Sequence, residues 1–262
     1  MELNATSFSE EMRLTDEKYW SDSYGSQVVF SDQHDHAVAV FLNQHLDDGH
    51  GKTSLEAGSF PGAFIPTVAR KGYLVHGVDF NSGNTKDLPD WLRSLGLPVG
   101  EFWRDDFFDF IKDDTKRFDL VCSFGLIEHF ENFEEVIKTH MDLVKPGGQL
   151  IITTPNFRGW MQFLPHRLFD NENLKKHYLP SMNPAKWRRL LESHGFTVNF
   201  SGYFGGYAFW VDPQQKRGPL TRLLLRISQT FIYQMRKVFL MLGWESAAFS
   251  GLCGITAKKR TL

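Results

Sequence analysis

The sequence predicts an α/β fold: a seven-stranded, mostly parallel sheet with helices on both faces. Short apolar runs alternate with amphipathic segments along most of the chain, which is typical of β–α–β units. Two of these runs end in an acidic residue just before a turn or a helix. The predicted strands are 54–56, 74–79, 102–104, 120–123, 150–154, 196–204 and 251–258.

Four segments between these strands have helical spacing: 61–71, 87–95, 132–144 and 184–194. An earlier helix is expected to be capped by Asp32, with Val38, Phe41, Leu42 and Leu46 on one face. We treat the chain as a single domain with four parts. These are an N-terminal helical cap over 1–50, a doubly wound core over 51–206, a basic amphipathic helical insertion over 213–243, and a last strand over 250–260.

Composition is that of an ordinary globular domain, with 262 residues, 42% hydrophobic and 23% charged. The net charge of −2 provides no overall positive field, so we do not expect nucleic acid as a partner. Met1–Asp16 has no signal-peptide pattern, and no apolar run is long enough to span a bilayer. Cys122 and Cys253 lack metal-ligand spacing and are expected to be buried thiols, which favours a cytoplasmic location.

Acids and glycines suggest a cofactor site. Glu56 ends an apolar run and is followed by Gly58 and Gly62, which let the backbone approach a ligand closely. Asp79 ends the next run, where a carboxylate can accept two hydrogen bonds from a ribose diol. Because ligands bind beyond the carboxyl ends of parallel strands, we expect these residues to share one site.

Two cofactor classes fit such a site, and charge distinguishes between them. The turn lacks the middle glycine of the dinucleotide fingerprint, since Phe60 stands there. An acid at position 56 would repel a diphosphate but would attract the ammonium of a methionine moiety. The residues therefore favour S-adenosylmethionine (SAM) over a nicotinamide cofactor.

Five blocks, in order along Leu55–Phe204, resemble the class I SAM-dependent methyltransferases, with their Rossmann-like fold. The blocks are Glu56-x-Gly58-x-x-x-Gly62, Asp79-Phe80, Asp105-Asp106-Phe107, the run Phe118–Phe130 with its Glu128-His129 ending, and Lys145-Pro146-Gly147-Gly148. The resemblance implies SAM as the cofactor, S-adenosylhomocysteine as its product, and no metal.

The resemblance also implies roles for individual residues. Asp79 would bind the ribose, Phe80 would cover the adenine, and Asp106, or alternatively Asp105, would contact the adenine amino group. The expected cofactor-binding set is Glu56, Gly58, Ser59, Gly62, Asp79, Phe80, Asp106, Phe107, Ser123 and Phe124. The Lys145–Gly148 segment is expected to be a structural turn.

Methyl transfer from a sulfonium needs mainly alignment, and a base only when the acceptor is a hydroxyl. His129, just past the fourth strand, is the first candidate for that base; the alternative is an ordering or cofactor-contacting role. His177 is the second candidate, with a surface loop as its alternative. The region 166–204 resembles enzymes that methylate small molecules, sugars and lipid-linked glycans, which favours O-methylation of such an acceptor.

The segment 213–243 carries six basic residues and no acid. On a helix its apolar residues share one face, so three placements stay open for 216–242: packed on the sheet, paired in a homodimer, or in peripheral contact with an anionic membrane. Three other functions also stay open: a SAM-binding protein without catalysis, a methyltransferase acting on RNA or protein, and a nicotinamide-dependent oxidoreductase.

Overall fold

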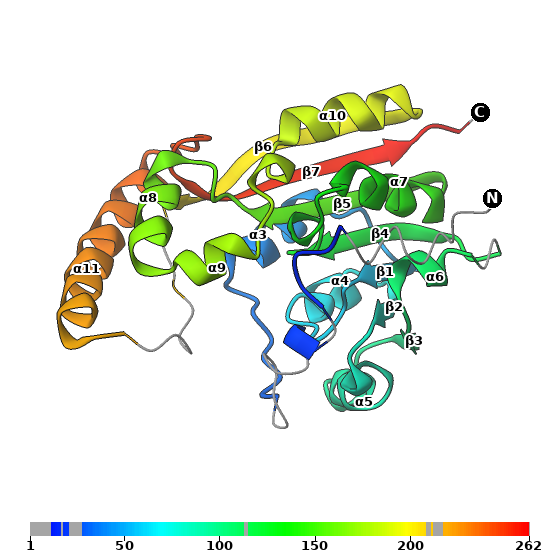
Figure 1. Cartoon of the computed structure of the whole chain (residues 1–262). Coiled ribbons are helices and arrows are strands. Elements are labelled where there is room, and N and C mark those ends of the chain that lie inside the picture. Colours follow the sequence, from blue (N-terminus) through cyan, green and yellow to red (C-terminus); the bar gives the residue numbers. More distant parts are fainter. Residues whose placement is uncertain are drawn as a thin grey trace, which may run out of the picture.

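A computed structural model describes residues 12–16, 18–20, 28–112, 115–207, 211 and 217–261. Seven strands form one sheet in the order β3-β2-β1-β4-β5-β7-β6, and β7 alone is antiparallel to its neighbours (Figure 1). This confirms the predicted seven-stranded, mostly parallel sheet. The strands are β1 Thr53–Ala57, β2 Leu74–Asp79, β3 Val99–Arg104, β4 Phe118–Phe124, β5 Val144–Pro155, β6 Phe196–Tyr207 and β7 Ser250–Lys259.

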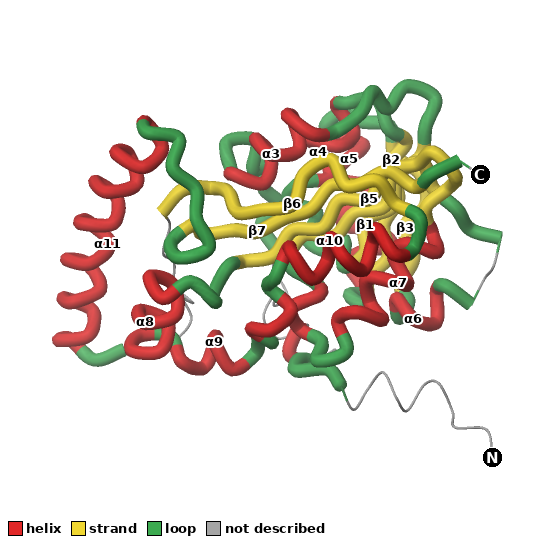
Figure 2. Tube along the Cα trace, turned by 90° about the horizontal axis from the view of Figure 1, so that it is seen from above, coloured by secondary structure: helices red, strands yellow, loops and turns green. Residues whose placement is uncertain are grey.

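Helices cover both faces of the sheet, as Figure 2 shows from above. α3, α4 and α5 lie on one face, and α6, α7 and α10 lie on the other. α8, α9 and α11 lie beyond one end of it. The helices are α3 Ala37–His45, α4 Ile65–Arg70, α5 Asp87–Ser94, α6 Phe107–Phe110, α7 Phe133–Leu143, α8 Trp160–Phe169, α9 Asn171–Lys175, α10 Pro184–Ser193 and α11 Pro219–Met241.

The strand pleat divides the core into two layers. Successive side chains in a strand point to opposite faces. In β5, Leu150 and Ile152 pack with the α7 and α10 layer, while Ile151 packs with the α3, α4 and α5 layer. Because both faces of these strands are buried, their sequences are almost continuously apolar.

The Lys145–Gly148 segment is not a turn before the fifth strand, as the sequence suggested. β5 already begins at Val144, which pairs with Phe118 of β4, and the next pair is Leu120 with Gln149. The four residues thus lie opposite the single residue Asp119 of β4, so β5 carries three extra residues at a shift of register. Gly147 has a φ of 77°, a conformation that favours glycine, which explains its place in this irregularity.

The predicted cap of α3 was wrong by four residues. A ring nitrogen of His36 accepts a hydrogen bond from the Val38 amide at 3.2 Å and caps the helix. Asp32 instead forms an ion pair with Arg70 at 2.5 Å. The sequence prediction also omitted α6, α8 and α9, which are short or, in α8, contain an internal proline, Pro165.

The aromatic residues of β6 belong mainly to the core. Phe204 stacks on Phe41 with ring centroids 4.4 Å apart, and Phe200 meets the same ring edge-on at 5.2 Å. They hold α3 against the sheet. The described residues do not include Tyr24, or Phe209 and Trp210, which follow β6.

Gln149 joins three elements and provides a test of the fold. Its buried amide nitrogen donates to the His45 carbonyl at 2.7 Å and to Thr256 Oγ1 at 3.0 Å, and its oxygen accepts from the Asp47 amide at 3.3 Å. Gln149→Ala leaves these buried groups without partners, so we expect urea denaturation to show a loss of about 1–3 kcal/mol in unfolding free energy. The exposed control Gln33→Ala should change it by less than about 0.5 kcal/mol. An equally small effect of Gln149→Ala would contradict this role.

Candidate functional site

A cavity of about 180 Å³ lies at the carboxyl ends of β1, β2 and β4. This is where ligands bind in open parallel sheets. Glu56, Gly58, Gly62, Asp79, Phe80, Phe107 and Phe124, all predicted from the sequence, line it. Ser59 and Ser123 are buried and do not appear in its lining; the Ser59 hydroxyl donates to Asn84 Oδ1 at 2.7 Å.

Glu56 is a buried carboxylate in the wall of this cavity. Only 6% of the residue is exposed, and its Oε2 has no hydrogen-bond partner among the described residues. Burial, followed by the nearby Asp79 carboxylate, raises the pKa of Glu56 well above its usual range. A cationic group placed beside this oxygen would relieve both effects.

Asp79 is held in place by the backbone. Its carboxylate accepts a hydrogen bond from the Asn81 amide at 2.8 Å and from the Phe60 amide at 3.2 Å. Burial raises the pKa of Asp79 to about 6, although these two hydrogen bonds act in the opposite direction. A carboxylate has about four acceptor positions, so two remain for a ligand such as a ribose diol.

The loop after β1 depends on glycine at two positions. Gly58 has a φ of 69°, and a Cβ there would lie 3.1 Å from Leu126 Cδ1. Gly62 has a φ of 77°, and a Cβ there would come within 2.5 Å of Leu88 Cδ1. Phe60, at the middle position, buries its ring and turns its amide toward Asp79. The loop thus fixes the Asp79 carboxylate without a third glycine.

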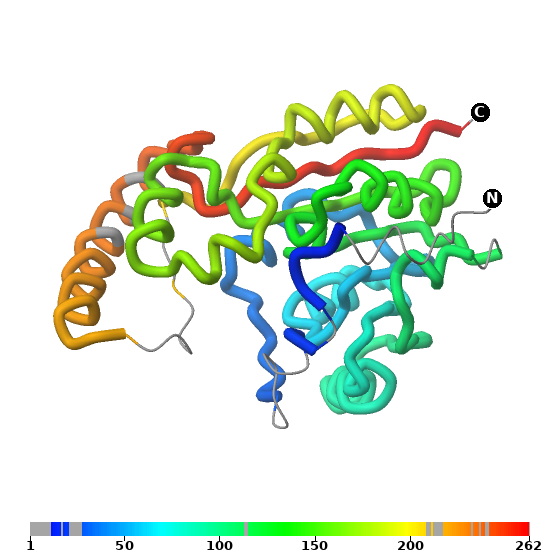
Figure 3. The backbone as a smooth tube through the Cα atoms, viewed as in Figure 1, coloured from blue at the N-terminus to red at the C-terminus, as the bar shows by residue number. Residues whose placement is uncertain are grey.

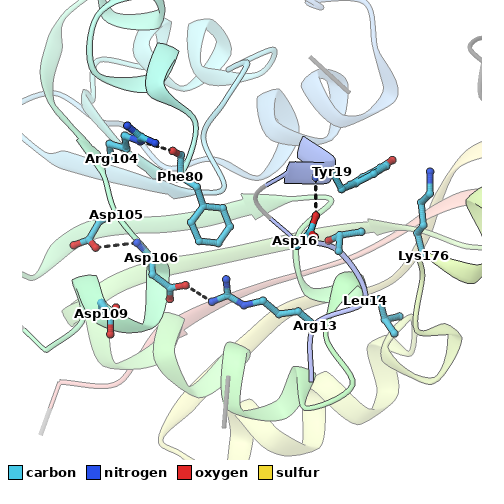
Figure 4. Close-up of a pocket in the computed structure, with 11 residues that line it drawn as sticks. Arg13, Leu14, Asp16, Tyr19, Phe80, Arg104, Asp105, Asp106, Asp109 and Lys176 are labelled. Atoms are coloured by element: carbon cyan, nitrogen blue, oxygen red, sulfur yellow. Dashed lines mark hydrogen bonds and ion pairs between the residues drawn. The ribbon is translucent and has the colours of Figure 1, made fainter. Parts of the chain in front are cut away.

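The two candidate acids after β3 have different surroundings. Asp106 caps α6 by accepting from the Phe108 amide at 2.7 Å, and it forms an ion pair with Arg13 (Figure 4). Asp105 lines the cavity and accepts from the Asp106 amide at 2.8 Å. The structure therefore places Asp105 in the cavity wall and Asp106 beside it; which acid contacts the adenine stays a prediction.

The N-terminal segment supplies two cavity residues that sequence reasoning missed, Arg13 and Trp20. Residues 12–16 lie along the 129–131 turn (dark blue in Figure 3). The Leu14 amide donates to the His129 carbonyl at 2.9 Å. The Arg13 guanidinium also lies 4.9 Å from the centre of the Phe80 ring. A lone arginine in an acidic stretch was the available signal, but nothing in the pattern places it at the site.

A wider, open groove of about 800 Å³ continues from the cavity past Phe80 and Asp105. Figure 4 shows residues from the N-terminal segment facing residues that follow β2 and β3 across it. Tyr19 and Lys176 lie at one side, with the Lys176 ammonium 4.2 Å from the Tyr19 ring centre. The N-terminal segment thus forms one wall of both spaces.

His129 and His177, the two candidate bases, lie side by side. Their ring centroids are 4.7 Å apart, and both rings are hydrogen-bonded through Nδ1 to backbone carbonyls, those of Lys176 at 2.8 Å and Asn173 at 2.7 Å. Burial, as the main cause, lowers the pKa of His129 to about 3 and that of His177 to about 4. Both imidazoles are therefore neutral near pH 7.

Glu128 completes this cluster. It is almost fully buried, its Oε2 has no partner among the described residues, and burial raises its pKa to about 8. One potential ligand atom from each of Glu128, His129 and His177 lies within 4.8 Å of the others, so the three could together hold a cation. The expectation of no metal stays a prediction, which assays with and without a chelator would test.

A second recess of about 310 Å³ adjoins the cavity, sharing Phe64, Phe124 and Gly125 with it. Thr153, Thr154 and Pro155 at the end of β5 and Leu252 of β7 form its far side. Its lining is mainly apolar, with a few hydroxyl groups. The structure therefore has two adjacent spaces whose common wall is at the end of β4.

Comparisons with known proteins agree with this geometry. A methyltransferase-domain family model matches residues 32–199. The ubiquinone biosynthesis O-methyltransferase of Coxiella burnetii is 28% identical over 153 residues, which is 56% of this chain and 64% of that protein. The chain spans less than two thirds of the length of the curated relatives it matches.

Two solved structures share the fold. A SAM-dependent methyltransferase from Archaeoglobus fulgidus has a TM-score of 0.53 at 19% identity, covering 85% of this chain and 93% of that one. The magnesium protoporphyrin IX methyltransferase of Synechocystis, with bound S-adenosylhomocysteine, has a TM-score of 0.52 at 15% identity, covering 98% and 95%.

The described residues fit SAM. The unpartnered Glu56 oxygen suits an ammonium, the remaining acceptor positions of Asp79 suit a ribose diol, and aromatic rings line the cavity. With the match over most of its length, the chain belongs to the class I SAM-dependent methyltransferases and not to the nicotinamide-dependent oxidoreductases.

Proposed function

We propose that this methyltransferase acts on a hydroxyl group of a small acceptor, bound in the recess between β4, β5 and β7. The observation that carries the proposal is the wall of Phe64, Phe124 and Gly125, which the recess and the cofactor cavity share. An acceptor in the recess would present its hydroxyl across this wall to the cofactor. The relatives named as O-methyltransferases support oxygen as the acceptor atom.

The chain's own residues mainly provide alignment. The sulfonium of SAM supplies the reactive methyl group. Glu56 would hold the ammonium and Asp79 the ribose, and the Gly58 loop would allow close approach. Alignment of this kind accounts for about 7–11 kcal/mol of a barrier in well-oriented reactions. Phe64 and Phe124, whose rings meet edge-on at 5.4 Å, would orient the acceptor.

We infer that His129 accepts the hydroxyl proton. His129 lies behind the lining of the cofactor cavity, next to the cavity residue Trp20, whose ring centre is 5.0 Å from that of His129. Its Nδ1 bond to the Lys176 carbonyl leaves Nε2 as the accepting nitrogen. Its pKa of about 3 keeps the ring neutral over the working pH range but makes it a weak base. Since proton transfer is favoured by a small pKa difference, an acidic hydroxyl suits this base better than an alcohol. The preferred acceptor is therefore a phenol, ahead of a sugar or a lipid-linked glycan.

The direct test is a turnover assay. Purified protein with SAM is given panels of phenols, of sugar alcohols, and of RNA and protein, and formation of S-adenosylhomocysteine and of methylated product is measured. Turnover with phenols supports the proposal. Turnover only with RNA or protein would overturn it in favour of a macromolecular acceptor. Binding of S-adenosylhomocysteine without turnover on any panel would favour a non-catalytic SAM-binding protein.

Cofactor affinity should depend on pH through Asp79. Its pKa of about 6 means that only about one molecule in eleven carries the ionised carboxylate at pH 5. The ribose hydroxyls donate to the ionised form, so S-adenosylhomocysteine should bind roughly tenfold more weakly at pH 5 than at pH 7 by calorimetry. Asp79→Asn should bind weakly at both values. Equal affinity of the wild-type protein at both pH values would contradict the assignment.

His129→Ala should slow turnover by about 10²-fold or more, because general base catalysis contributes about that much. Affinity for S-adenosylhomocysteine should stay nearly unchanged, since His129 does not appear in the lining of the cofactor cavity. The same assay on His177→Ala tests the second candidate. His194→Ala, exposed at the end of α10, is the control. An unchanged kcat in His129→Ala with the true acceptor would refute the base assignment.

Glu128 should lower stability as the pH rises. Its folded pKa of about 8 lies above its ordinary value of 4.5, so the folded state favours the protonated form. The contribution of the protonated Glu128 carboxyl to folding stability is fully present below about pH 4.5 and is lost as the pH rises through 8. The unfolding free energy of Glu128→Gln relative to that of the wild type should therefore rise by roughly 2 kcal/mol from pH 6 to pH 8. Urea denaturation in the presence of a chelator measures it. Glu134→Gln, which is exposed on α7, should show no such gain.

A further inference from the structure

α11 stands apart from the sheet and presents much of its apolar surface to solvent. In Figures 1 and 2 it lies at the far end of the molecule, beside α8. It is held there by a small cluster in which Leu225 packs near Tyr207, Met161 and Phe169. The sequence left open whether its apolar face packs on the sheet. The structure shows that most of the described part of this face does not.

The exposed residues form an apolar stripe along α11, which Leu242 extends just past the last helical residue. Spacings of three, four and seven residues put them on one side of the helix. Their exposed fractions run from 44% to 70%. Surfaces of this size on soluble proteins usually mark a site of interaction. The members of this α11 stripe are Leu220, Leu223, Leu224, Ile227, Phe231, Val238 and Leu242.

Basic side chains cover the rest of the helix: at about 3.6 residues per turn, Arg226 and Lys237 lie beside the stripe and Arg222 lies on the opposite side. Arg222, Arg226 and Lys237 are exposed on the same helix, and α11 contains no acidic residue. Arg226 lines a shallow surface groove of about 440 Å³ together with Ile227 and Phe231. An apolar stripe beside basic residues is complementary to a surface that has an apolar interior and negative charges at its boundary.

α8 adds a second exposed apolar stripe. Trp160, Phe163, Leu164 and Leu168 follow the i, i+3, i+4, i+8 pattern and are 39% to 64% exposed. α8 contacts α11 through the cluster around Leu225. Two adjacent helices thus expose apolar residues at the same end of the molecule, which a single surface contact could cover.

We propose that α11, with α8 beside it, binds the surface of an anionic lipid bilayer. The apolar stripe would enter the boundary between headgroups and acyl chains, and Arg222, Arg226 and Lys237 would contact lipid phosphates. None of the helices in the described ranges is long and apolar enough to cross a bilayer, so the contact lies in the interface plane.

A second copy of the chain fits this surface less well. A twofold contact through α11 brings the same patch from both copies together. Because α11 has basic residues and no acid, the basic residues of each copy would meet those of the other copy or remain unpaired. An anionic bilayer provides the opposite charge. This charge argument selects lipid over self-association.

Vesicle co-sedimentation of the full chain tests the proposal. The protein should bind vesicles of phosphatidylcholine mixed with phosphatidylglycerol, bind pure phosphatidylcholine vesicles weakly, and lose affinity as salt screens the charges. The triple variant R222Q/R226Q/K237Q should lose roughly 100-fold in affinity, at about 1 kcal/mol for each basic residue near the surface. K112Q/K138Q/R188Q removes the same charge elsewhere and should bind like the wild type.

A second variant tests the apolar stripe. I227S/F231S should bind poorly to both vesicle types, while its S-adenosylhomocysteine affinity and melting temperature match the wild type. That cofactor readout separates failure of the lipid proposal from failure of the proposed function. Wild-type affinity in either α11 variant overturns the proposal. So does a concentration-dependent dimer in sedimentation velocity that I227S/F231S dissociates and that does not bind vesicles.

Discussion

Two carboxylates, Glu56 and Asp79, are buried in one cavity at the ends of neighbouring strands, and much of the site is organised around them. Burial raises the pKa of both carboxyls, and the nearby Asp79 carboxylate adds to the cost of ionising Glu56. The protein offsets it only in part: two backbone amides reach Asp79, but one Glu56 oxygen has no partner among the described residues. A ligand that brings an ammonium and a diol supplies what the fold leaves out, so the strain in the free protein favours that ligand.

The local backbone follows from this arrangement. Phe60 must direct its amide to Asp79 while its ring packs in the core, and Gly58 and Gly62 adopt positive φ on either side of it. At the other side of the cavity, Arg13 pairs with Asp106 and covers Phe80. Charge in the site is therefore balanced unevenly: Asp106 is paired with Arg13 within the protein, whereas Asp79 accepts hydrogen bonds from backbone amides and one Glu56 oxygen has no partner among the described residues.

Sequence reasoning worked where a residue's role depends on its own strand or turn. The seven strands and the acids at 56 and 79 belong to this group, because alternation and strand ends are local signals. It failed where position depends on distant contacts. Arg13 and Trp20 come from a segment without hydrophobic periodicity. The β-bridge between Arg13 and Phe130 holds this segment over the site. The apolar pattern of α11 predicted a helix, yet a pattern cannot show whether a covering surface exists.

The connectivity links the exposed helices to the recess that we propose binds the acceptor. β5 ends at Pro155, which lines the recess, and α8 starts five residues later; β7, which follows α11, contributes Leu252 to the same recess. An acceptor that is both phenolic and lipid-soluble, as we propose, would suit three separate features: the buried, neutral His129, a mainly apolar recess and an apolar surface flanked by basic residues. Each feature rests on different residues, so their agreement on one acceptor class is stronger than any of them alone.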